Sequence, residues 1–147
     1  MQQSQFLDQE QRLATERRIK YKGTARIRLD VLHFQWNEPR ELNQKNLKRL
    51  KKCFQTEGCR RLELDNHIPA IIKESQLDDA IVASRISADV LLSNLSDDYP
   101  ELKFPAGFQL ECLHGRHRVQ AGRETLPSRD KWWTVDLYLE GISISNE

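Results

Sequence analysis

The sequence predicts a single α+β domain in which a small mixed sheet packs against helices. The chain has 147 residues, and because a typical domain has roughly 100–200, we expect one hydrophobic core. Residues 26–32 and 132–139 alternate apolar and polar side chains, which is the period of a half-buried strand. Residues 43–57 instead carry an apolar stripe at helical spacing. This mixture of periods predicts the α+β class.

The composition is that of a globular protein. Hydrophobic residues make up 38% of the chain and charged residues 31%, which leaves enough apolar side chains for a core. No stretch approaches the roughly 18 apolar residues of a membrane span. The start of the chain lacks the basic and then apolar order of a signal peptide. We therefore expect an intracellular protein, nuclear or cytoplasmic, with no membrane partner and with reduced cysteines.

The first elements are an arm, a strand and a loop. Residues 1–22 are predicted to form a polar N-terminal arm or helix that Gly23 ends. The strand over 26–32 places three apolar side chains on one face, namely Ile27, Leu29 and Val31. A loop over 35–40 follows, because Pro39 interrupts any regular element there.

A basic amphipathic helix is predicted next. Asn43 is a favourable N-cap, the helix runs to about Glu57, and Gly58 suits its end. The apolar stripe of this helix consists of Leu47, Leu50 and Phe54. After the helix, residues 68–72 are predicted to form a short strand, with Pro69 at the edge of the sheet because proline has no N–H to donate.

The formal net charge of +1 conceals two opposite poles. Residues 43–61 have seven basic residues and one acidic residue, a charge of +6. Residues 74–101 have seven acidic residues and one basic residue, a charge of −6. Apolar residues within the acidic segment suggest one or two short helices, so we predict a helical insertion over 74–104. The two charged segments either dock on each other or offer the acidic one to a protein partner.

The last third of the chain has the order strand, glycine, helix, strand. Phe108, Leu110 and Cys112 share one face of the first strand, and the turn His114–Gly115 leads into a helix over 116–125. Leu126 and Pro127 close that helix, and the strand over 132–139 follows a turn at 128–130. The predicted domain therefore spans residues 23–142, and residues 143–147 form a tail.

The turn before the helix at 116–125 is the predicted functional site. Backbone N–H groups at a helix N-terminus lack partners within the helix, and the helix dipole adds positive charge there. Gly115 allows an anion to approach the backbone, and Arg116 and Arg118 would pair with phosphate oxygens. The alternative is that these arginines pair with internal acids, such as Glu124 or the acidic segment.

Residues 114–121, HGRHRVQA, resemble the Gly-x-x-Arg-x-x-Ala box of the ParB/sulfiredoxin superfamily. The earlier elements follow a similar order, with a first strand, the loop Asn37–Arg40, a helix, and the Ile-Pro-x-Ile strand. The resemblance implies that phosphates of a nucleotide lie on a turn made of His114, Gly115, Arg116, His117 and Arg118. Arg40 is a weaker match for the facing loop, and His117 is expected to adjust affinity with pH.

A second resemblance is closer. The strings 112–118 (CLHGRHR), 130–139 (DKWWTVDLYL) and 53–61 (CFQTEGCRR) are similar to a large fungal family of unknown function found among the cargo of giant mobile elements. Members of that family extend beyond the point that corresponds to Glu147, so we expect a fragment or a short paralogue.

Two departures limit what the first resemblance implies. Sulfiredoxins place a reactive cysteine directly after the turn glycine, whereas this sequence has Arg116, so reductase activity is not implied. Chromosome-partitioning relatives have a helix-turn-helix domain after the nucleotide module, which the residues after Glu140 are too few to form.

The ligand expected at Gly115–Arg118 is either a nucleoside triphosphate with Mg²⁺, as the resemblance implies, or a phosphate group of a nucleic acid. Relatives hydrolyse or transfer phosphate, so NTPase activity is left open. No general base is identified; Glu111 and Glu124 lie nearest to the turn in sequence.

Three further residue patterns have alternative interpretations. Cys112, His114 and His117 have metal-ligand chemistry, but a second paired cluster is missing, so no zinc is expected. Cys112 is interpreted as a structural thiol because its strand face is apolar. Lys45, Lys48, Arg49 and Lys52 either contact DNA or RNA backbone or form the solvated face of their helix. Trp132 either stacks on a base or covers the insertion.

Two other functions stay open at this stage. A DNA-processing, nuclease-like domain would need a metal and carboxylates near Gly115. A ligand-free protein-interaction module would instead use the charged segments.

Overall fold

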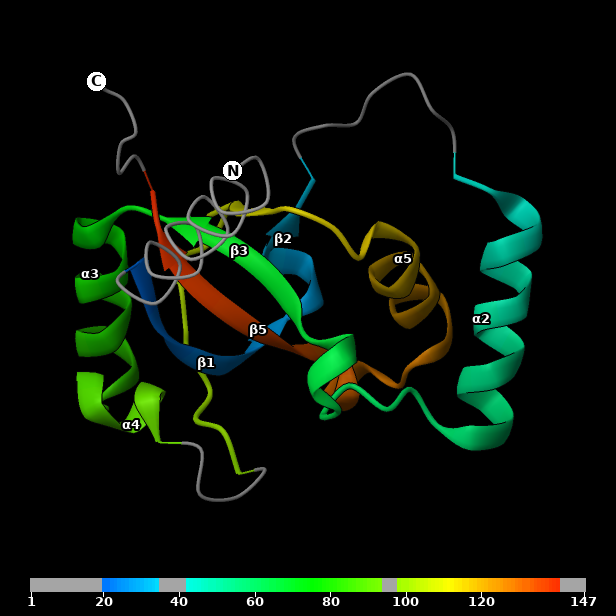
Figure 1. The fold of residues 1–147 in the computed structure, drawn as a ribbon, viewed down its shortest axis with the longest axis horizontal. Coiled ribbons are helices and arrows are strands. Elements are labelled where there is room, and N and C mark those ends of the chain that lie inside the picture. The colour runs from blue at the N-terminus through cyan, green and yellow to red at the C-terminus, as the bar shows by residue number, and fades with distance from the viewer. Residues whose placement is uncertain (1–19, 35–41, 94–97, 141–147) are drawn as a thin grey trace, which may run out of the picture.

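The computed structural model describes residues 20–34, 42–93 and 98–140, and its fold is drawn in Figure 1. It confirms the α+β class, with one mixed sheet of five strands in the order β1-β5-β3-β4-β2. The strands are β1 Tyr21–Arg28, β2 Leu32–His33, β3 Ile68–Ile72, β4 Leu110–Cys112 and β5 Trp132–Leu139. The α-helices are α2 Gln44–Glu57, α3 Glu74–Ser84, α4 Ala88–Leu92 and α5 Arg116–Thr125. Within the described ranges there are also three 3₁₀ turns: η1 Leu29–Val31, η2 Leu64–Asn66 and η3 Ser128–Asp130.

β5 lies inside the sheet and carries much of the core. It pairs with β1 in the antiparallel sense and with β3 in the parallel sense. As the alternation predicted, Trp133, Val135 and Leu137 are fully buried. Their partners on one face include Ile27 of β1 and Ile68 of β3, which are also fully buried. Burial of this apolar face is the main stabilising term of the fold.

The first strand lies earlier in the chain than predicted. β1 starts at Tyr21, runs through Gly23 and ends at Arg28, after which Leu29–Val31 form a 3₁₀ turn. Gly23 has a φ of +131°, and a Cβ there would lie 2.4 Å from the backbone oxygen of Leu91 in α4. The glycine therefore lets α4 approach the strand closely rather than ending the preceding arm.

The predicted edge position of Pro69 is wrong. β3 is the central strand, between β5 and β4. Proline is tolerated because β4 ends at Cys112, and the next residue, Leu113, donates its N–H to the Pro69 carbonyl at 2.9 Å. The N–H that proline lacks would therefore point towards Leu113, which lies beyond the last residue of β4, so no hydrogen bond within β4 is lost.

The acidic segment contains two helices, as predicted, and returns to the sheet. α3 and α4 lie within it, and then Arg26 of β1 donates its N–H to the Pro100 carbonyl at 2.8 Å. Figure 1 places α3 and α4 at the opposite end of the long axis from α2, the basic helix. Among the described residues, the acidic helices α3 and α4 therefore do not dock on the basic helix α2.

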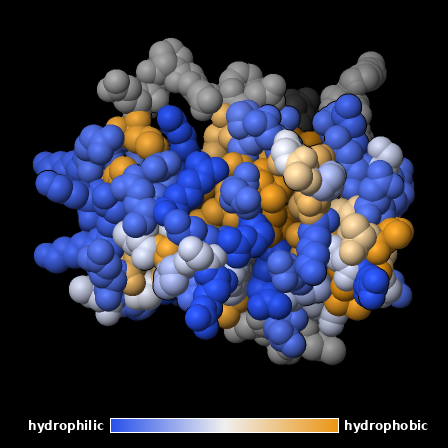
Figure 2. All heavy atoms as spheres, turned by 180° about the vertical axis from the view of Figure 1, so that it is seen from behind, coloured by the Kyte–Doolittle hydropathy of each residue, from blue (hydrophilic) through white to orange (hydrophobic). Residues whose placement is uncertain are grey.

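The surface seen from behind is largely hydrophilic, with a hydrophobic area near its middle (Figure 2). None of the helices in the described ranges combines the length and apolar composition that a bilayer crossing needs. Most of the predicted arm, the loop over 35–40 and the tail lie outside the described residues.

Candidate functional site

The turn before α5 has the geometry that the sequence predicted. Gly115 is the N-cap residue, with a φ of +101° and a ψ of 14°. No side chain caps this end of the helix, and the first turn contains no acidic residue. Within the described part of the chain, no hydrogen bond satisfies the backbone N–H of His117 or Arg118. These donors and the helix dipole create a positive potential at the turn.

Gly115 is required by packing as well as by backbone conformation. A Cβ at this position would lie 2.9 Å from Cγ1 of Ile68, a core residue of β3. The positive φ also disfavours any side chain. The glycine is therefore explained without a ligand, and the argument for an anion has to come from the groups around it.

The N-termini of α2 and α5 converge. Nε2 of His117, in the first turn of α5, accepts a hydrogen bond from the backbone N–H of Asn43 at 2.9 Å. Asn43 is the N-cap of α2, as predicted, and its Oδ1 accepts from the N–H of Asn46 at 3.0 Å. The first turn of α2 also lacks an acidic residue. Two helix dipoles thus direct their positive ends towards one region.

The internal acids proposed as partners of the arginines are engaged elsewhere. Glu124 accepts from Gln120 at 2.6 Å and pairs with Nζ of Lys51 at 2.7 Å. These two hydrogen bonds hold the pKa of the Glu124 carboxyl below its usual value. The acidic helices lie at the far end of the molecule (Figure 1). Among the described residues, no ion pair involves Arg118, whose side chain is partly exposed.

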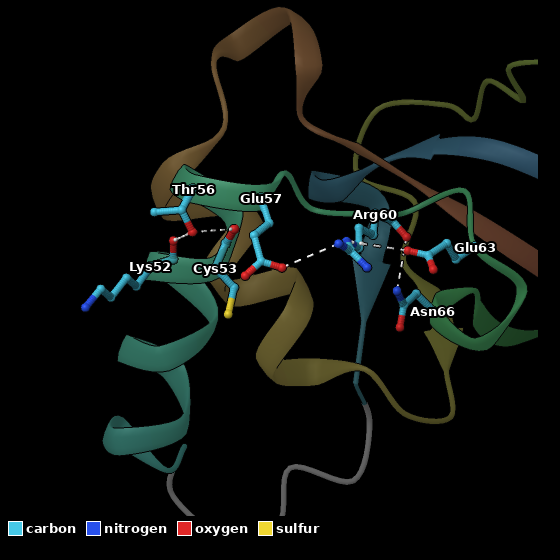
Figure 3. Close-up of polar contacts among 7 residues, drawn as sticks. All are labelled: Lys52, Cys53, Thr56, Glu57, Arg60, Glu63 and Asn66. Atoms are coloured by element: carbon cyan, nitrogen blue, oxygen red, sulfur yellow. Dashed lines mark hydrogen bonds and ion pairs between the residues drawn. The ribbon is translucent and has the colours of Figure 1, made fainter.

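The remaining predicted site residues are distributed around this turn and along α2. His114 is exposed, and Arg40 lies outside the described residues. Lys45, Lys48, Arg49 and Lys52 are all exposed on α2, and with Glu124 and Thr125 they line a shallow groove between α2 and α5. Figure 3 shows Lys52 pointing away from the end of α2, where Arg60 lies between Glu57 and Glu63.

Cys112 behaves as the structural thiol that its strand face predicted. Its side chain is buried, and burial raises the pKa of the thiol to about 12. Such a thiol stays protonated near neutral pH and is a poor nucleophile and metal ligand. In the described ranges, no group of three or more His, Cys, Asp or Glu residues is arranged to hold a metal ion.

Sequence reasoning missed a buried polar network on the other face of the sheet. Nδ1 of His67 lies 3.0 Å from Oδ1 of Asp136, and Nε2 lies 3.2 Å from the Leu62 carbonyl. The Thr24 hydroxyl donates to the same Asp136 oxygen at 2.7 Å. His67 and Thr24 are both buried. The only sequence signal was the polar face of the last strand, since the pairing of β5 with β1 and β3 could not be known.

Sequence reasoning also missed the arginines around Trp132. The Arg61 guanidinium lies 3.4 Å from the centroid of the Trp132 ring, and its Nη1 donates to the carbonyls of Asp130 at 2.6 Å and Trp132 at 3.1 Å. Burial lowers the pKa of Arg61 below its usual value. One face of the indole is thus covered by a cation, and that face is closed to stacking on a base.

Comparison with known proteins places the chain in a family of unknown function. The model of the family described as "Protein of unknown function (DUF3723) N-terminal domain" matches residues 20–147. The chain belongs to this family. The fungal origin and the link to mobile elements stay predictions for this DUF3723 domain.

No curated protein matches the chain. Among solved structures, the DUF3723 domain is similar to the C-terminally truncated chromosome-partitioning protein ParB from Caulobacter crescentus, complexed with CTP-γ-S. The TM-score is 0.44 and the sequence identity 11%, over 82% of this chain and 46% of that chain. The DUF3723 domain thus spans less than half the length of that ParB chain.

Proposed function

We propose that the DUF3723 domain binds the phosphate groups of a nucleoside triphosphate at the N-terminus of α5. The observation that carries the proposal is that two features occur together at this turn. Backbone N–H groups there have no capping partner, and Arg118 has no ion-pair partner among the described residues. Backbone N–H groups of His117 and Arg118 would donate to phosphate oxygens, and the Arg118 guanidinium would pair with their charge. The nearby N-terminus of α2 adds to the same positive potential.

The other predicted residues have supporting roles in this proposal. Gly115 permits the backbone conformation of the turn, and Arg116 adds charge. His114 and Arg40 are carried over from the sequence resemblance alone. A bound triphosphate commonly carries Mg²⁺, which phosphate oxygens and water coordinate. The proposal concerns binding and not hydrolysis, because Glu124 is already engaged by Lys51 and Gln120.

Thermal unfolding with a panel of ATP, CTP and GTP, with and without Mg²⁺, tests this proposal. A ligand that binds the folded state at about 100 times its Kd stabilises it by about 2.7 kcal/mol, which is a readily measured rise in Tm. Arg118→Ala should abolish the rise, whereas Arg85→Ala, which removes an exposed arginine at the end of α3, should keep it. No rise with any triphosphate at saturation, or an equal rise in Arg118→Ala, would overturn the proposal.

A second function is supported by the surface of α2. Lys45, Lys48 and Lys52 are exposed on this helix, and none of them forms an ion pair with a described residue. We infer that they contact the phosphate backbone of a nucleic acid, since such a row of unpaired cations attracts a polyanion. Short oligonucleotides in the same panel give a first measure of this contact.

The two remaining alternatives have less support. A nuclease-like site needs carboxylates that converge near Gly115, and the described residues contain no metal-binding cluster of that kind. A protein partner for the acidic segment is compatible with the exposed apolar side chains of Val82, Val90 and Leu92 on α3 and α4. A module of this last kind would show no stabilisation by nucleotides.

A further inference from the structure

A second cationic pocket lies where β1 ends and β5 begins. Arg26 and Arg28 of β1 line it together with Trp132 of β5, Arg129 of η3, and Glu101 from the chain after α4. The strand register places Arg28 opposite Trp132, and Arg26 lies on the same face two residues earlier. Guanidinium groups from two distant parts of the sequence are therefore gathered around one hollow.

The charges of this pocket are not balanced internally. Within the described part of the chain, none of the three arginines forms an ion pair, and Glu101 does not pair with them. Three guanidinium groups and one carboxylate give the lining a net charge of +2. Like charges held together in a partly enclosed site repel one another unless an anion joins them.

Two buried polar atoms beside the pocket also lack partners. Nε of Arg26 and Oγ1 of Thr134 are shielded from solvent and make no hydrogen bond within the described residues. Arg26 and Thr134 face each other across β1 and β5. Unsatisfied polar groups are rare in folded proteins, so the Arg26 side chain keeps donor capacity that no described residue uses at Nε.

Two walls of the pocket, Arg28 and Trp132, are held in place before any ligand arrives. Nη2 of Arg28 donates to the Ser128 carbonyl at 3.0 Å. The Arg61 guanidinium covers the Trp132 ring and donates hydrogen bonds to two backbone carbonyls, which hold it in place. Arg26 lies 5.4 Å from the centroid of the same ring. Pre-organised guanidinium groups lose little freedom on binding an oxyanion.

The charge of the pocket matches one class of anion. A phosphate monoester carries about −1.5 to −2 at pH 7 and offers three acceptor oxygens. A carboxylate, with a charge of −1, would leave one positive charge uncompensated. The planar fork of arginine also suits the spacing of phosphate oxygens.

The hollow continues over an apolar surface. An adjoining pocket shares Arg28 and Glu101 with the first and is lined further along by Phe104 and Phe108. The two phenyl rings are stacked, with centroids 4.7 Å apart and planes 5° from parallel. An organic group attached to the phosphate would have this surface to lie on.

We propose that this pocket is a binding site for a phosphate monoester. The phosphate lies between Arg26, Arg28 and Arg129, and the organic part contacts the Phe104–Phe108 pair. The site is separate from the proposed triphosphate site, because η3 follows the C-terminal end of α5 and the ten residues of that helix span about 15 Å. It does not depend on the function proposed for Gly115–Arg118.

The test measures the binding of phenyl phosphate, inorganic phosphate and phenol by the whole chain. Trp132 lines the pocket, so its fluorescence reports occupancy, and calorimetry gives the stoichiometry. We expect one phenyl phosphate per chain and tighter binding than for inorganic phosphate, with no saturable binding of phenol. Equal affinities for phenyl phosphate and inorganic phosphate would overturn the role given to the phenylalanine pair.

Variants locate the site. Arg129→Gln should weaken phenyl phosphate binding about tenfold or more, since a charge-assisted hydrogen bond is lost. Arg129 is exposed and has no hydrogen bond from its side chain within the described residues, so this variant should fold normally, as circular dichroism can check. Arg28→Gln is the second variant, and Arg85→Gln, with the same change of charge, is the control that should bind like the wild type.

Arg118→Ala separates this proposal from the previous one. Phenyl phosphate binding that survives Arg118→Ala and is lost in Arg129→Gln supports the second site. Binding that is lost in Arg118→Ala and unchanged in Arg129→Gln and Arg28→Gln would overturn it, and so would the absence of saturable binding by the wild type.

Discussion

His117 holds the start of α5 against the start of α2, because its Nε2 accepts the backbone N–H of Asn43 at 2.9 Å. The hydrogen bond joins residues that are 74 positions apart in the sequence. It uses a donor at the N-cap that the helix itself cannot satisfy. A side chain predicted to touch phosphate therefore has a structural role that brings two helix N-termini together.

Replacing His117 tests this role. His117→Ala removes the acceptor, and we expect the free energy of unfolding to fall by about 0.5–1.5 kcal/mol, as for other single hydrogen bonds. Urea denaturation at neutral pH measures the loss. His114→Ala, which changes an exposed histidine three residues earlier, should leave stability unchanged. Equal stabilities of wild type and His117→Ala would contradict this account.

Gly115 offers a test of packing at the turn. Gly115→Ala places a methyl group against Ile68 at a φ of +101°, so both a clash and backbone strain arise. We expect a loss of about 1–3 kcal/mol in the free energy of unfolding. Gly107→Ala is a matched control, because Gly107 has a φ of +83° and open space around its missing Cβ. Equal losses in the two variants would show that contact with Ile68 costs nothing.

The helices and the last strand could be predicted because local signals determine them. Asn43, the apolar stripe of α2 and Gly58 mark that helix, and α2 begins and ends where they indicate. The alternation around Trp133 is equally local, and the burial of Trp133, Val135 and Leu137 confirms its apolar face, although Thr134 on the opposite face is buried as well. Each of these signals lies within one element and needs no knowledge of its neighbours.

Other features depend on contacts between distant segments and could not be predicted. Leu29 stays buried in a 3₁₀ turn as it would in a strand, so the alternation did not show where β1 ends. The central position of β3 depends on which strands pair, and the presence of Pro69 wrongly indicated an edge strand. Arg28 and Trp132 meet only through the register of β1 with β5. The phosphate pocket at that place was therefore invisible in the sequence.

Cys112 should govern part of the response to alkali. Its folded-state pKa is raised to about 12 by burial, above the ordinary value of about 8.5 for an unfolded cysteine. The unfolded chain therefore ionises first, and the stabilising contribution is complete below about pH 8.5. It is lost as the pH rises towards 12, at up to about 1.4 kcal/mol per pH unit.

Two measurements check this behaviour. The free energy of unfolding should fall more steeply between about pH 9 and 11 in the wild type than in Cys112→Ala. Ellman's reagent at pH 8 should label Cys53 and Cys59, which are partly exposed, and leave Cys112 unmodified until the protein is denatured. Rapid labelling of all three cysteines in the native protein would show that the Cys112 thiol is accessible.

The basic face of α2 makes a quantitative prediction about nucleic acid. If Lys45, Lys48 and Lys52 contact phosphates, each contact releases a counterion, and affinity falls as salt is added. The triple variant with glutamine at these positions should therefore reduce the slope of log K against log salt by about 1 for each lysine that contacts a phosphate. Fluorescence anisotropy with a labelled duplex over a range of salt concentrations measures the slope.

A control must separate a local contact from a change in net charge. Glutamine at Lys73, Lys103 and Lys131 removes the same total charge from elsewhere on the chain. A contact confined to α2 predicts that this control keeps the wild-type slope, because only cations close to a phosphate displace its counterions. If both triple variants lose the same slope, the nucleic acid responds to net charge alone. The lysines of α2 are then the solvated face of an amphipathic helix. The triphosphate proposal at α5 is not affected by this result, because it rests on other residues.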